Sequence, residues 1–500
     1  MVFAGKCTGM MSDNAQRLPG FIWPVFAGLI MAAFGLRVWL GLGLPLWLDE
    51  SWTAMIATQP NWADFWREVW LDCNPPLYYA VMAVWTGVFG ASDLALRLPS
   101  LIFAALAIAL PLGLRVPALS RAAALCFAVL LALWQPGFEI SVDARGYALV
   151  LALSVAQLLA YIRLMAAPDR RRAWIWASLA SLAGLTHYHA LLVSGLQGLA
   201  LLYVHRGRAL QLWPAALAFV PAFAWLAIHA PRLADYARPD VAWYEPMTPS
   251  LAAALIRYVL GGAGWLHIGI LAGLIVLSQA MAWRQPAAPI APMAEARRAL
   301  RWAVLASVIG LMIELALGAL RPMLTDRYLV PLVPGILLGL VLAIGQSRYY
   351  VACLAALILA FGLTLNPSDM RAKLVEKTRY SFAPASNFVA NSPAKRLVFA
   401  WDHPAARILD AQSLAKLGGF FTARAGRDMP VTAIRLPPGR DGNALLQRAS
   451  PADAGVIWIY NRARASAARH RPPVPLLWHG RDCQLEKTRW IGTLACAPKV

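Results

Sequence analysis

The chain has 500 residues, of which 60% are hydrophobic and 14% are charged, and its mean hydropathy is +0.56. Because soluble domains carry about 25% charged residues, this composition excludes a soluble protein and indicates a polytopic α-helical membrane protein. The formal net charge of +20 comes from basic residues in short loops between apolar segments. That is the positive-inside pattern, and it argues against nucleic acid as a partner.

Apolar segments long enough to cross a bilayer, about 20 residues each, recur along the chain. They predict about eleven transmembrane helices, near residues 21–42, 96–114, 122–138, 147–166, 174–187, 190–204, 212–230, 264–283, 302–320, 329–346 and 351–366. Arginine-rich loops alternate along the chain, and all of them lie in the cytoplasm when the N-terminus does. Residues 1–20 are polar and run into a full-length span, so we expect no cleavable signal peptide.

This alternation bears on the apolar stretch from Pro75 to Gly90. If the stretch crossed the membrane, the arginines at 170–172 would lie outside. Its length of about 16 residues and its two leading prolines favour a helix at the outer interface. The stretch then belongs to one large first outer loop, about residues 43–95. A true span is the alternative.

The composition changes after residue 366, where charge, proline and glycine increase and no further span occurs. Short apolar runs at Arg396–Trp401 and Gly455–Tyr460 predict buried strands, and Ala405–Leu417 predicts a helix. We therefore expect a membrane domain over residues 1–366 and an extracytoplasmic α/β domain over residues 367–500. Cys483 and Cys496 lie in the latter, at a spacing that permits a disulfide on an oxidising side.

The first outer loop opens with two adjacent acids, Asp49 and Glu50, directly after the first span. Carboxylates at the edge of a bilayer are costly without a partner or a function, which makes this pair a candidate catalytic site. An ionised Asp49 is the best general base, because it can accept a hydrogen bond from an acceptor hydroxyl and orient it. Glu50 shares that duty, binds a metal or pairs with Arg145, and these roles stay open. The alternative is a solvated loop start with two chance acids.

Groups suited to a phosphate occur on other outer segments. Arg145 and Arg327, the latter beside Tyr328, are candidate phosphate ligands, since a guanidinium offers forked donors and stays charged. For each arginine the alternative is an interfacial anchor or a structural ion pair. Further candidate substrate-binding residues on the same face are Asp143, Asn74, Tyr78, His187 and His189.

His187 and His189 are only two residues apart. On a helix their rings point apart and cannot chelate an ion together, whereas in an extended loop they can. The alternative gives one histidine a hydrogen bond and leaves the other facing lipid headgroups. The residues therefore leave a divalent metal open, and no motif requires another cofactor. The chain has no P-loop, glycine-rich dinucleotide turn or serine nucleophile elbow, so we expect a lipid-borne donor.

Four ordered motifs resemble the polyprenyl-phosphate-dependent glycosyltransferases of the GT-C fold. They are Leu48-Asp49-Glu50; Asn74-Pro75-Pro76-Leu77-Tyr78-Tyr79, followed by Leu96-Arg97-Leu98-Pro99-Ser100; Ser141-Val142-Asp143-Ala144-Arg145-Gly146-Tyr147; and Asp326-Arg327-Tyr328-Leu329-Val330-Pro331. The similarity is to the bacterial branch of the protein mannosyltransferase family, which includes the aminoarabinose transferase acting on lipid A. It covers about residues 20–345. Asn74 stands where that family often has histidine. Val142 replaces an arginine, which leaves Arg145 as the remaining basic residue of its motif.

The resemblance implies a mechanism. A sugar on a polyprenyl phosphate enters from the lipid bilayer, and an acceptor hydroxyl that Asp49 deprotonates attacks the anomeric carbon with inversion. The lipid phosphate then leaves toward Arg145 and Arg327. The implied location is the bacterial inner membrane, with the C-terminal domain on the periplasmic side. The acceptor is a glycolipid, a polysaccharide or a protein, and residues 367–500 resemble no family.

Two other functions are compatible with a polytopic membrane protein. A transporter or flippase of lipid-linked sugars would place its polar site near the bilayer midplane, on broken helices within repeats. This chain has its conspicuous polar groups at one face and no internal repeat. A membrane-anchored binding protein would act through residues 367–500, so that their removal would abolish its function.

Overall fold

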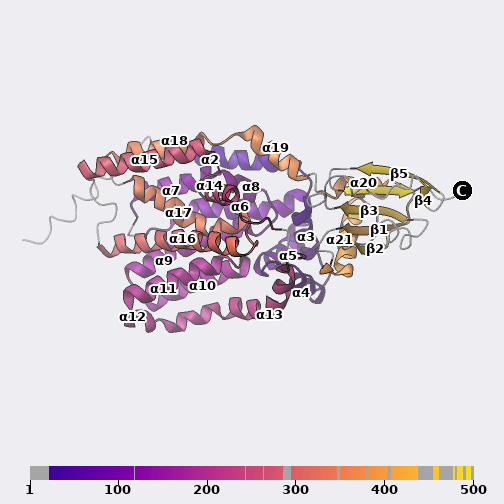
Figure 1. The fold of residues 1–500 in the computed structure, drawn as a ribbon, viewed down its shortest axis with the longest axis horizontal. Coiled ribbons are helices and arrows are strands. Elements are labelled where there is room, and N and C mark those ends of the chain that lie inside the picture. Colours follow the sequence, from indigo (N-terminus) through magenta and orange to yellow (C-terminus); the bar gives the residue numbers. More distant parts are fainter. Residues whose placement is uncertain are drawn as a thin grey trace, which may run out of the picture. The chain divides into compact units, whose positions relative to one another are not determined.

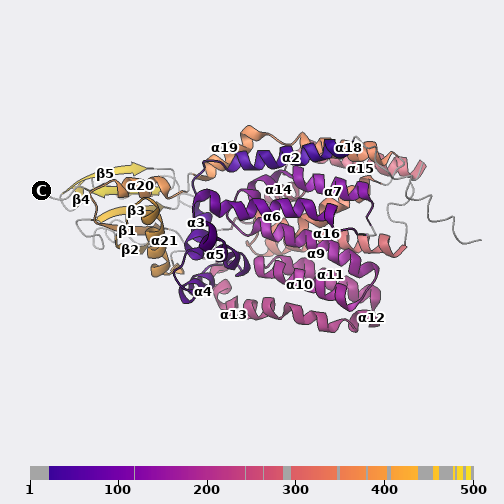
Figure 2. The same cartoon turned by 180° about the vertical axis from the view of Figure 1, so that it is seen from behind.

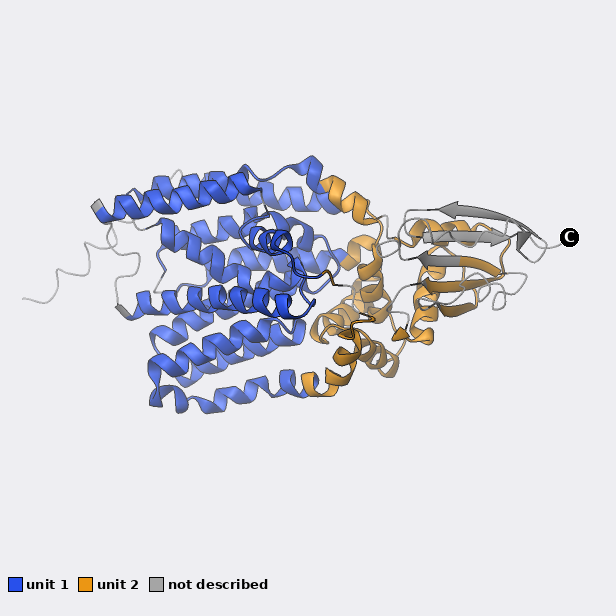
Figure 3. Ribbon diagram, in the orientation of Figure 1, with its two compact units in different colours: residues 1–41, 97–225, 246–370 blue, residues 42–96, 226–245, 371–500 orange. Residues whose placement is uncertain are grey.

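The computed structural model describes most of the chain. The residues that it leaves undescribed are 1–21, 117–118, 242–243, 263, 285–293, 346–348, 379–380, 403–406, 437–453, 461–476, 479–480, 488–490 and 497–500. Only the backbone is described at residues 22–23, 284, 294, 350, 402, 436, 457–460, 477–478, 481–487 and 491–496. The contacts divide the chain into two compact units, coloured in Figure 3. Unit 1 comprises residues 1–41, 97–225 and 246–370, and unit 2 comprises residues 42–96, 226–245 and 371–500.

Unit 1 is a helical bundle, seen from two sides in Figures 1 and 2. Its helices are α2 (Ile22–Gly41), α7 (Arg121–Leu133), α8 (Gln135–Ser141), α9 (Tyr147–Ala166), α10 (Arg170–Thr186), α11 (Ala190–His205), α12 (Gly207–Leu210), η1 (Trp213–Phe219), α14 (Pro249–Val259), α15 (Trp265–Arg284), α16 (Ala294–Leu320), η2 (Asp326–Leu332), α17 (Val333–Ile344) and α18 (Tyr350–Gly362). Three helices carry the chain across the unit boundary: α6 (Asp93–Gly113), α13 (Val220–Tyr236) and α19 (Pro367–Thr378). Helix α9 packs against α10 and α16, and because 83% of its span is buried it forms the centre of the bundle.

The helices confirm a polytopic membrane protein. Among the described residues, seven helices are long and apolar enough to cross a membrane, or up to nine if each of two bent pairs is one span. The predicted spans at 174–187 and 190–204 form α10 and α11, whose 17 and 16 residues are short for a span of about 20. Every predicted segment is helical. How many of them cross the bilayer stays a prediction.

One bent pair forms the approach to a predicted motif. The chain turns by 64° between α7 and α8. Pro136 stands in the first turn of α8, where a missing N–H leaves no helical hydrogen bond unmade. Gly137 permits the tight corner, because a Cβ atom there would lie 2.9 Å from the Trp134 ring. The bend ends α7 at Leu133, before the end of the predicted span, and it places Ser141 at the turn before α9.

Unit 2 joins the first outer loop to the C-terminal domain. The loop forms three short helices, α3 (Leu48–Ala57), α4 (Trp62–Leu71) and α5 (Leu77–Phe89). The C-terminal domain contains α20 (Ala383–Ala390), α21 (Ala411–Arg424), β1 (Arg396–Asp402), β2 (Val431–Leu436), β3 (Ala454–Tyr460), β4 (Leu477–Trp478), β5 (Arg481–Lys487) and β6 (Ile491–Cys496). The sheet order is β2-β1-β3-β6-β5-β4, with β2 and β3 parallel to β1 and the remaining pairs antiparallel.

The predicted α/β character of the tail is confirmed, with one boundary wrong. The two predicted strands are β1 and β3. The helix expected over Ala405–Leu417 instead begins at Ala411, because the Asp410 carboxylate accepts a hydrogen bond from the Ser413 N–H and caps it. Residues 403–406 lie outside the described part of the chain.

The stretch from Pro75 to Gly90 forms α5, which has 13 residues. At 1.5 Å per residue this helix is about 20 Å long, shorter than the bilayer's hydrocarbon core of about 30 Å. It belongs to unit 2 together with the C-terminal domain. Its length agrees with an interfacial helix, and its position in the membrane stays a prediction.

Cys483 and Cys496 are directly opposed in the register of β5 and β6. Opposed residues of antiparallel strands have Cα atoms about 4.5–5.5 Å apart. That separation lies within the range that a disulfide requires. Both side chains lie outside the described part of the structure, so the disulfide stays a prediction.

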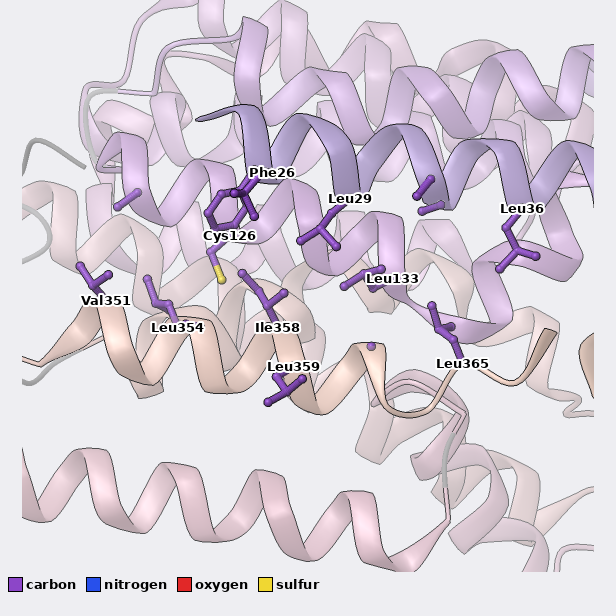
Figure 4. Close-up of a pocket in the computed structure, with 16 residues that line it drawn as sticks. Phe26, Leu29, Leu36, Cys126, Leu133, Val351, Leu354, Ile358, Leu359 and Leu365 are labelled. Carbon is purple, nitrogen blue, oxygen red and sulfur yellow. The ribbon is translucent and has the colours of Figure 1, made fainter. Parts of the chain in front are cut away.

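An apolar cavity of about 670 Å³ lies between α2, α7 and α18 in unit 1 (Figure 4). Its lining is hydrocarbon apart from the thiol of Cys126. None of the predicted site residues lines it. The cavity therefore cannot supply acid–base chemistry, and the candidate site must be built from polar residues elsewhere.

Candidate active site

The turn between α8 and α9 carries the motif from Ser141 to Tyr147. The carbonyl oxygen of Asp143 accepts hydrogen bonds from the Ser100 hydroxyl at 2.6 Å and from the Arg145 N–H at 2.7 Å. The Ser100 bond ties this motif to the predicted motif at the start of the second span. Arg145 is only 8% exposed, so its side chain is largely removed from solvent. Asp143 is also buried, and its main chain organises the turn.

Arg37 supports the same turn from α2. Its Nε donates to the Ser141 hydroxyl at 3.0 Å, and its guanidinium carbon lies 3.9 Å from the centroid of the Phe138 ring. The side chain is fully enclosed, with 1% of its surface exposed. Ionisable residues inside apolar spans are costly and face protein partners, which is the signal that marks Arg37 in the sequence. Arg37 lies outside the four sequence motifs.

Two histidines and two tyrosines form a ring cluster in unit 1. The ring centroids of His187 and Tyr328 are 4.9 Å apart, and those of His189 and Tyr328 are 4.8 Å apart. The Arg327 guanidinium carbon lies 5.3 Å from the Tyr147 ring centroid, and Tyr147 in turn approaches His187 at 5.8 Å. The turn between α10 and α11 thus meets the segment of η2. Two predicted motifs, far apart in the sequence, converge on one set of rings.

The electrostatics of this cluster favour a neutral His187. Burial lowers the pKa of His187 well below 6.5, and the charges of His189, Arg145 and Arg327 lower that pKa further. A neutral imidazole has one N–H donor and one acceptor nitrogen. Its Nδ1 is buried and has no hydrogen-bond partner among the described residues. An unpartnered buried polar atom costs about 1–3 kcal/mol, so a ligand that formed a hydrogen bond with this nitrogen would recover that free energy.

Glu314 is a second buried ionisable residue outside the four sequence motifs. It lies within the apolar helix α16 and is 4% exposed. His189 Nδ1 donates to Glu314 Oε1 across 2.7 Å. The pairing fixes the His189 ring, and so it supports the stack with Tyr328. An acid inside a predicted span was the available signal.

The two first-loop acids lie in the first turn of α3, in unit 2. Asp49 is half-buried, and Glu50 is fully buried. Glu50 Oε2 accepts a hydrogen bond from the Trp47 backbone N–H at 3.1 Å, which is the carboxylate half of a capping box at the start of the helix. A carboxylate in this position caps its own helix. Glu50 therefore has a structural role that the sequence left open, and Asp49 is the more accessible acid.

Asn74 and its neighbours converge on Asp72 at the turn between α4 and α5. Asp72 Oδ1 accepts hydrogen bonds from the Asn74 side-chain amide at 2.8 Å and from the Tyr79 hydroxyl at 2.9 Å. Tyr78 is buried, with 3% of its surface exposed. Through these contacts Asn74 stabilises the turn between α4 and α5. A direct contact of Asn74 or Tyr78 with substrate stays a prediction.

Metal binding was left open by the sequence. Within the described residues, no three His, Cys, Asp or Glu side chains are grouped as ligands for an ion. His187 and His189 have ring centroids 5.3 Å apart, and Glu314 already holds His189.

The predicted site residues fall into the two units. Unit 1 brings together the predicted phosphate ligands and the two histidines, namely Arg145, Arg327, Tyr328, His187 and His189. Asp143 lies in the same unit, in the turn that carries Arg145. Unit 2 contains the predicted acids and the Asn74–Tyr78 motif. The roles of all these residues stay predictions.

Comparison with known proteins identifies the fold. No protein-family model matches the chain, and no curated protein matches it in sequence. The crystal structure of ArnT from Cupriavidus metallidurans in the apo state is similar, with a TM-score of 0.57 and 14% identity over 95% of this chain and 98% of that chain. The structure of the same protein bound to undecaprenyl phosphate has a TM-score of 0.54 and 15% identity, with the same coverage. The chain therefore has an ArnT-like fold, as its motifs predicted.

Proposed function

We propose that this membrane protein of ArnT-like fold is a glycosyltransferase. It moves a sugar from a polyprenyl-phosphate donor to an acceptor hydroxyl, with inversion at the anomeric carbon. The observation that carries this proposal is the cluster of Arg145, Arg327 and the neutral His187 in unit 1. The cluster combines two fixed positive charges with a buried nitrogen that lacks a partner among the described residues.

A phosphate of a lipid donor suits this cluster. Guanidinium groups bind phosphate oxygens through two parallel N–H donors, and burial strengthens the attraction. The imidazole of His187 adds a neutral donor when its Nδ1 carries the proton. ArnT was crystallised with undecaprenyl phosphate, which supports a polyprenyl phosphate as the lipid carrier here.

Transfer is a single displacement. The acceptor O–H gives its proton to the Asp49 carboxylate, and the acceptor oxygen forms a bond to the anomeric carbon. The bond between that carbon and the phosphate oxygen breaks on the opposite face, and the lipid phosphate leaves with the electron pair. Arg145 and Arg327 stabilise the charge that develops on the phosphate, a kind of interaction that commonly contributes most to catalysis.

We place the reaction at the outer face of the bacterial inner membrane. The alternating arginine loops orient the N-terminus toward the cytoplasm and the C-terminal domain toward the periplasm. A lipid-borne donor reaches the site from the bilayer, and the acceptor is a glycolipid, a polysaccharide or a protein at that face.

The test uses the purified full chain in detergent with a panel of radiolabelled polyprenyl-phosphate sugars. Wild type is compared with Asp49→Asn, and Asp428→Asn is the matched control, since Asp428 is an exposed acid of the same unit. We expect wild type and the control to release lipid phosphate, and Asp49→Asn to lose at least about 100-fold in rate. Near wild-type turnover by folded Asp49→Asn would remove Asp49 as the base. No turnover of any donor by folded wild type would reject the glycosyltransferase function.

A further inference from the structure

The C-terminal segment holds both flanks of the sequence that bears Asp49. On helix α19, Arg371 donates from Nη2 to the Leu42 carbonyl oxygen at 2.7 Å. One turn and a half later on the same helix, the Lys377 ammonium lies 4.0 Å from the centroid of the Trp47 ring. Leu42 and Trp47 bracket the approach to α3, and Trp47 is the N-cap of that helix.

A second contact reaches the other side of the acid. Trp52 follows Asp49 by three residues, so the two side chains lie on one face of α3. Trp401, near the end of strand β1, meets Trp52 edge-on with ring centroids 5.8 Å apart. Helix α21 of the C-terminal domain also packs against α3. The tail therefore contacts α3 both before and after Asp49.

A partly buried ion-pair network, with Glu68 at its buried centre, joins α4 to the same domain. Glu68 of α4 is 2% exposed, and its carboxylate accepts hydrogen bonds from Lys416 at 3.0 Å and from the Ser413 hydroxyl at 2.5 Å. Lys416 also bonds Asp64 at 2.8 Å, and Arg67 bridges to Asp410 at 2.7 Å. The buried Glu68 charge is compensated by Lys416 and Ser413 of α21. The network therefore attaches α4 to α21.

The first-loop helices need these contacts. Helices α3 and α4 have 10 residues each. Isolated helices shorter than about 12 residues are marginal in water, so packing rather than propensity determines where such helices lie. Catalytic geometry is sensitive to small displacements, and an error of about 1 Å can cost about 100-fold in rate. What fixes α3 therefore fixes the acid on it.

We infer that the C-terminal domain is a positioning element for the first-loop acid, acting through Lys377 on Trp47 and Trp401 on Trp52. The inference rests on the proposed function, in which Asp49 is the base. It makes residues 371–424 part of the machinery that transfers the sugar. Lys377 is a positioning residue: it touches the helix cap and not the reacting atoms.

The experiment compares the variant Lys377→Met with two control variants. Lys377→Arg keeps the cation over the ring, and Lys373→Met makes the same substitution at an exposed lysine one turn earlier on α19. We expect Lys377→Met to lower kcat at least about tenfold at unchanged donor KM and melting temperature. Lys377→Arg should restore kcat, and Lys373→Met should match wild type. Unchanged kcat in Lys377→Met, or an equal loss in Lys373→Met, would overturn the inference.

A double-mutant cycle isolates the contact itself. Trp47→Leu removes the aromatic face on which Lys377 lies, so adding Lys377→Met to Trp47→Leu should have little further effect on kcat. Losses that multiply across the two substitutions would show that they act independently, which would also overturn the inference.

Hydrogen exchange separates this inference from the proposed function. In Lys377→Met, and not in Lys373→Met, we expect faster exchange at the amides of residues 48–57. This measurement requires no activity. If wild type turned over no donor, faster exchange would still support the positioning of α3, whereas unchanged exchange would reject it.

Discussion

His189 and Glu314 form a short hydrogen bond inside unit 1, with His189 Nδ1 2.7 Å from Glu314 Oε1. The acid belongs to an apolar helix, and the histidine belongs to the turn between α10 and α11. The contact therefore joins a membrane helix to the ring cluster around Tyr328. The contact orients one ring of the cluster, because Glu314 holds the His189 ring in place.

Replacing Glu314 with leucine should loosen this cluster. Glu314→Leu leaves His189 Nδ1 unpaired in a buried place, at a cost of about 1–3 kcal/mol. Glu314→Gln retains an accepting oxygen and should be milder. The melting temperature in detergent measures the effect, with Glu295→Leu as the control, because Glu295 is an exposed acid on the same helix. Equal melting temperatures for the two leucine variants would contradict a supporting role.

The two clustered arginines should differ from other arginines in what they do to turnover. Arg145→Met and Arg327→Met each remove a proposed phosphate ligand, and we expect kcat to fall about 100- to 1,000-fold. Lysine at either position keeps the charge but loses the forked geometry, so recovery should be partial. Arg208→Met is the control, since Arg208 is exposed in the same unit. Methionine variants that turn over donor like this control would exclude phosphate binding there.

His187 should make the protein less stable in mild acid. Its pKa is held well below 6.5 in the folded state, mainly by burial, whereas the unfolded chain takes up the proton near 6.5. Below that pH the unfolded state therefore binds more protons, and the free energy of unfolding falls as pH decreases. The destabilisation is absent above about pH 6.5, where the imidazole of His187 is neutral in both the folded and the unfolded state.

Melting curves between about pH 7.5 and 5 test this pH dependence. The chain has eight histidines, so the informative quantity is the difference between wild type and His187→Asn. We expect the variant to lose part of the acid-dependent decrease in melting temperature. Parallel curves for both proteins would show that His187 is charged in the folded state, or that its burial is relieved.

Glu50 and Asp49 should respond differently to amide substitution. Glutamine at Glu50 still accepts the hydrogen bond from the Trp47 N–H, so Glu50→Gln should retain most turnover. Glu50→Ala removes the cap, which costs about 0.5–2 kcal/mol. Donor turnover and melting temperature are measured together. A loss in Glu50→Gln as deep as in Asp49→Asn, at unchanged melting temperature, would give Glu50 a chemical role as well.

Cys483 and Cys496 should form a disulfide if the C-terminal domain faces an oxidising compartment. Their opposed register on β5 and β6 provides the separation that the bond requires. Protein purified without reductant should show one pair of thiols that reacts with a maleimide only after reduction. Cys483→Ser should expose the Cys496 thiol without reductant. Both thiols reacting at once in freshly isolated wild type would place the domain in a reducing compartment or reject the pairing.

The sequence alone determined the class of the protein and the location of its long apolar helices. Apolar segments, the alternation of arginine loops and the change of composition after residue 366 act locally, so they can be read without knowledge of contacts. The motifs around Asp49, Arg145 and Arg327 also pointed to the ArnT-like fold, because short ordered patterns persist where overall identity is only 14%.

Only the tertiary structure decided how the polar residues are used. Arg37 and Glu314 are single ionisable residues within apolar spans, and their partners are 104 and 125 residues away in the sequence. Glu50 proved to be a helix cap, which depends on where α3 begins. The grouping of the first outer loop with residues 371–424 rests on contacts such as Lys377 with Trp47, which no local pattern encodes. Sequence patterns specify the elements, whereas packing between distant segments determines which side chains meet.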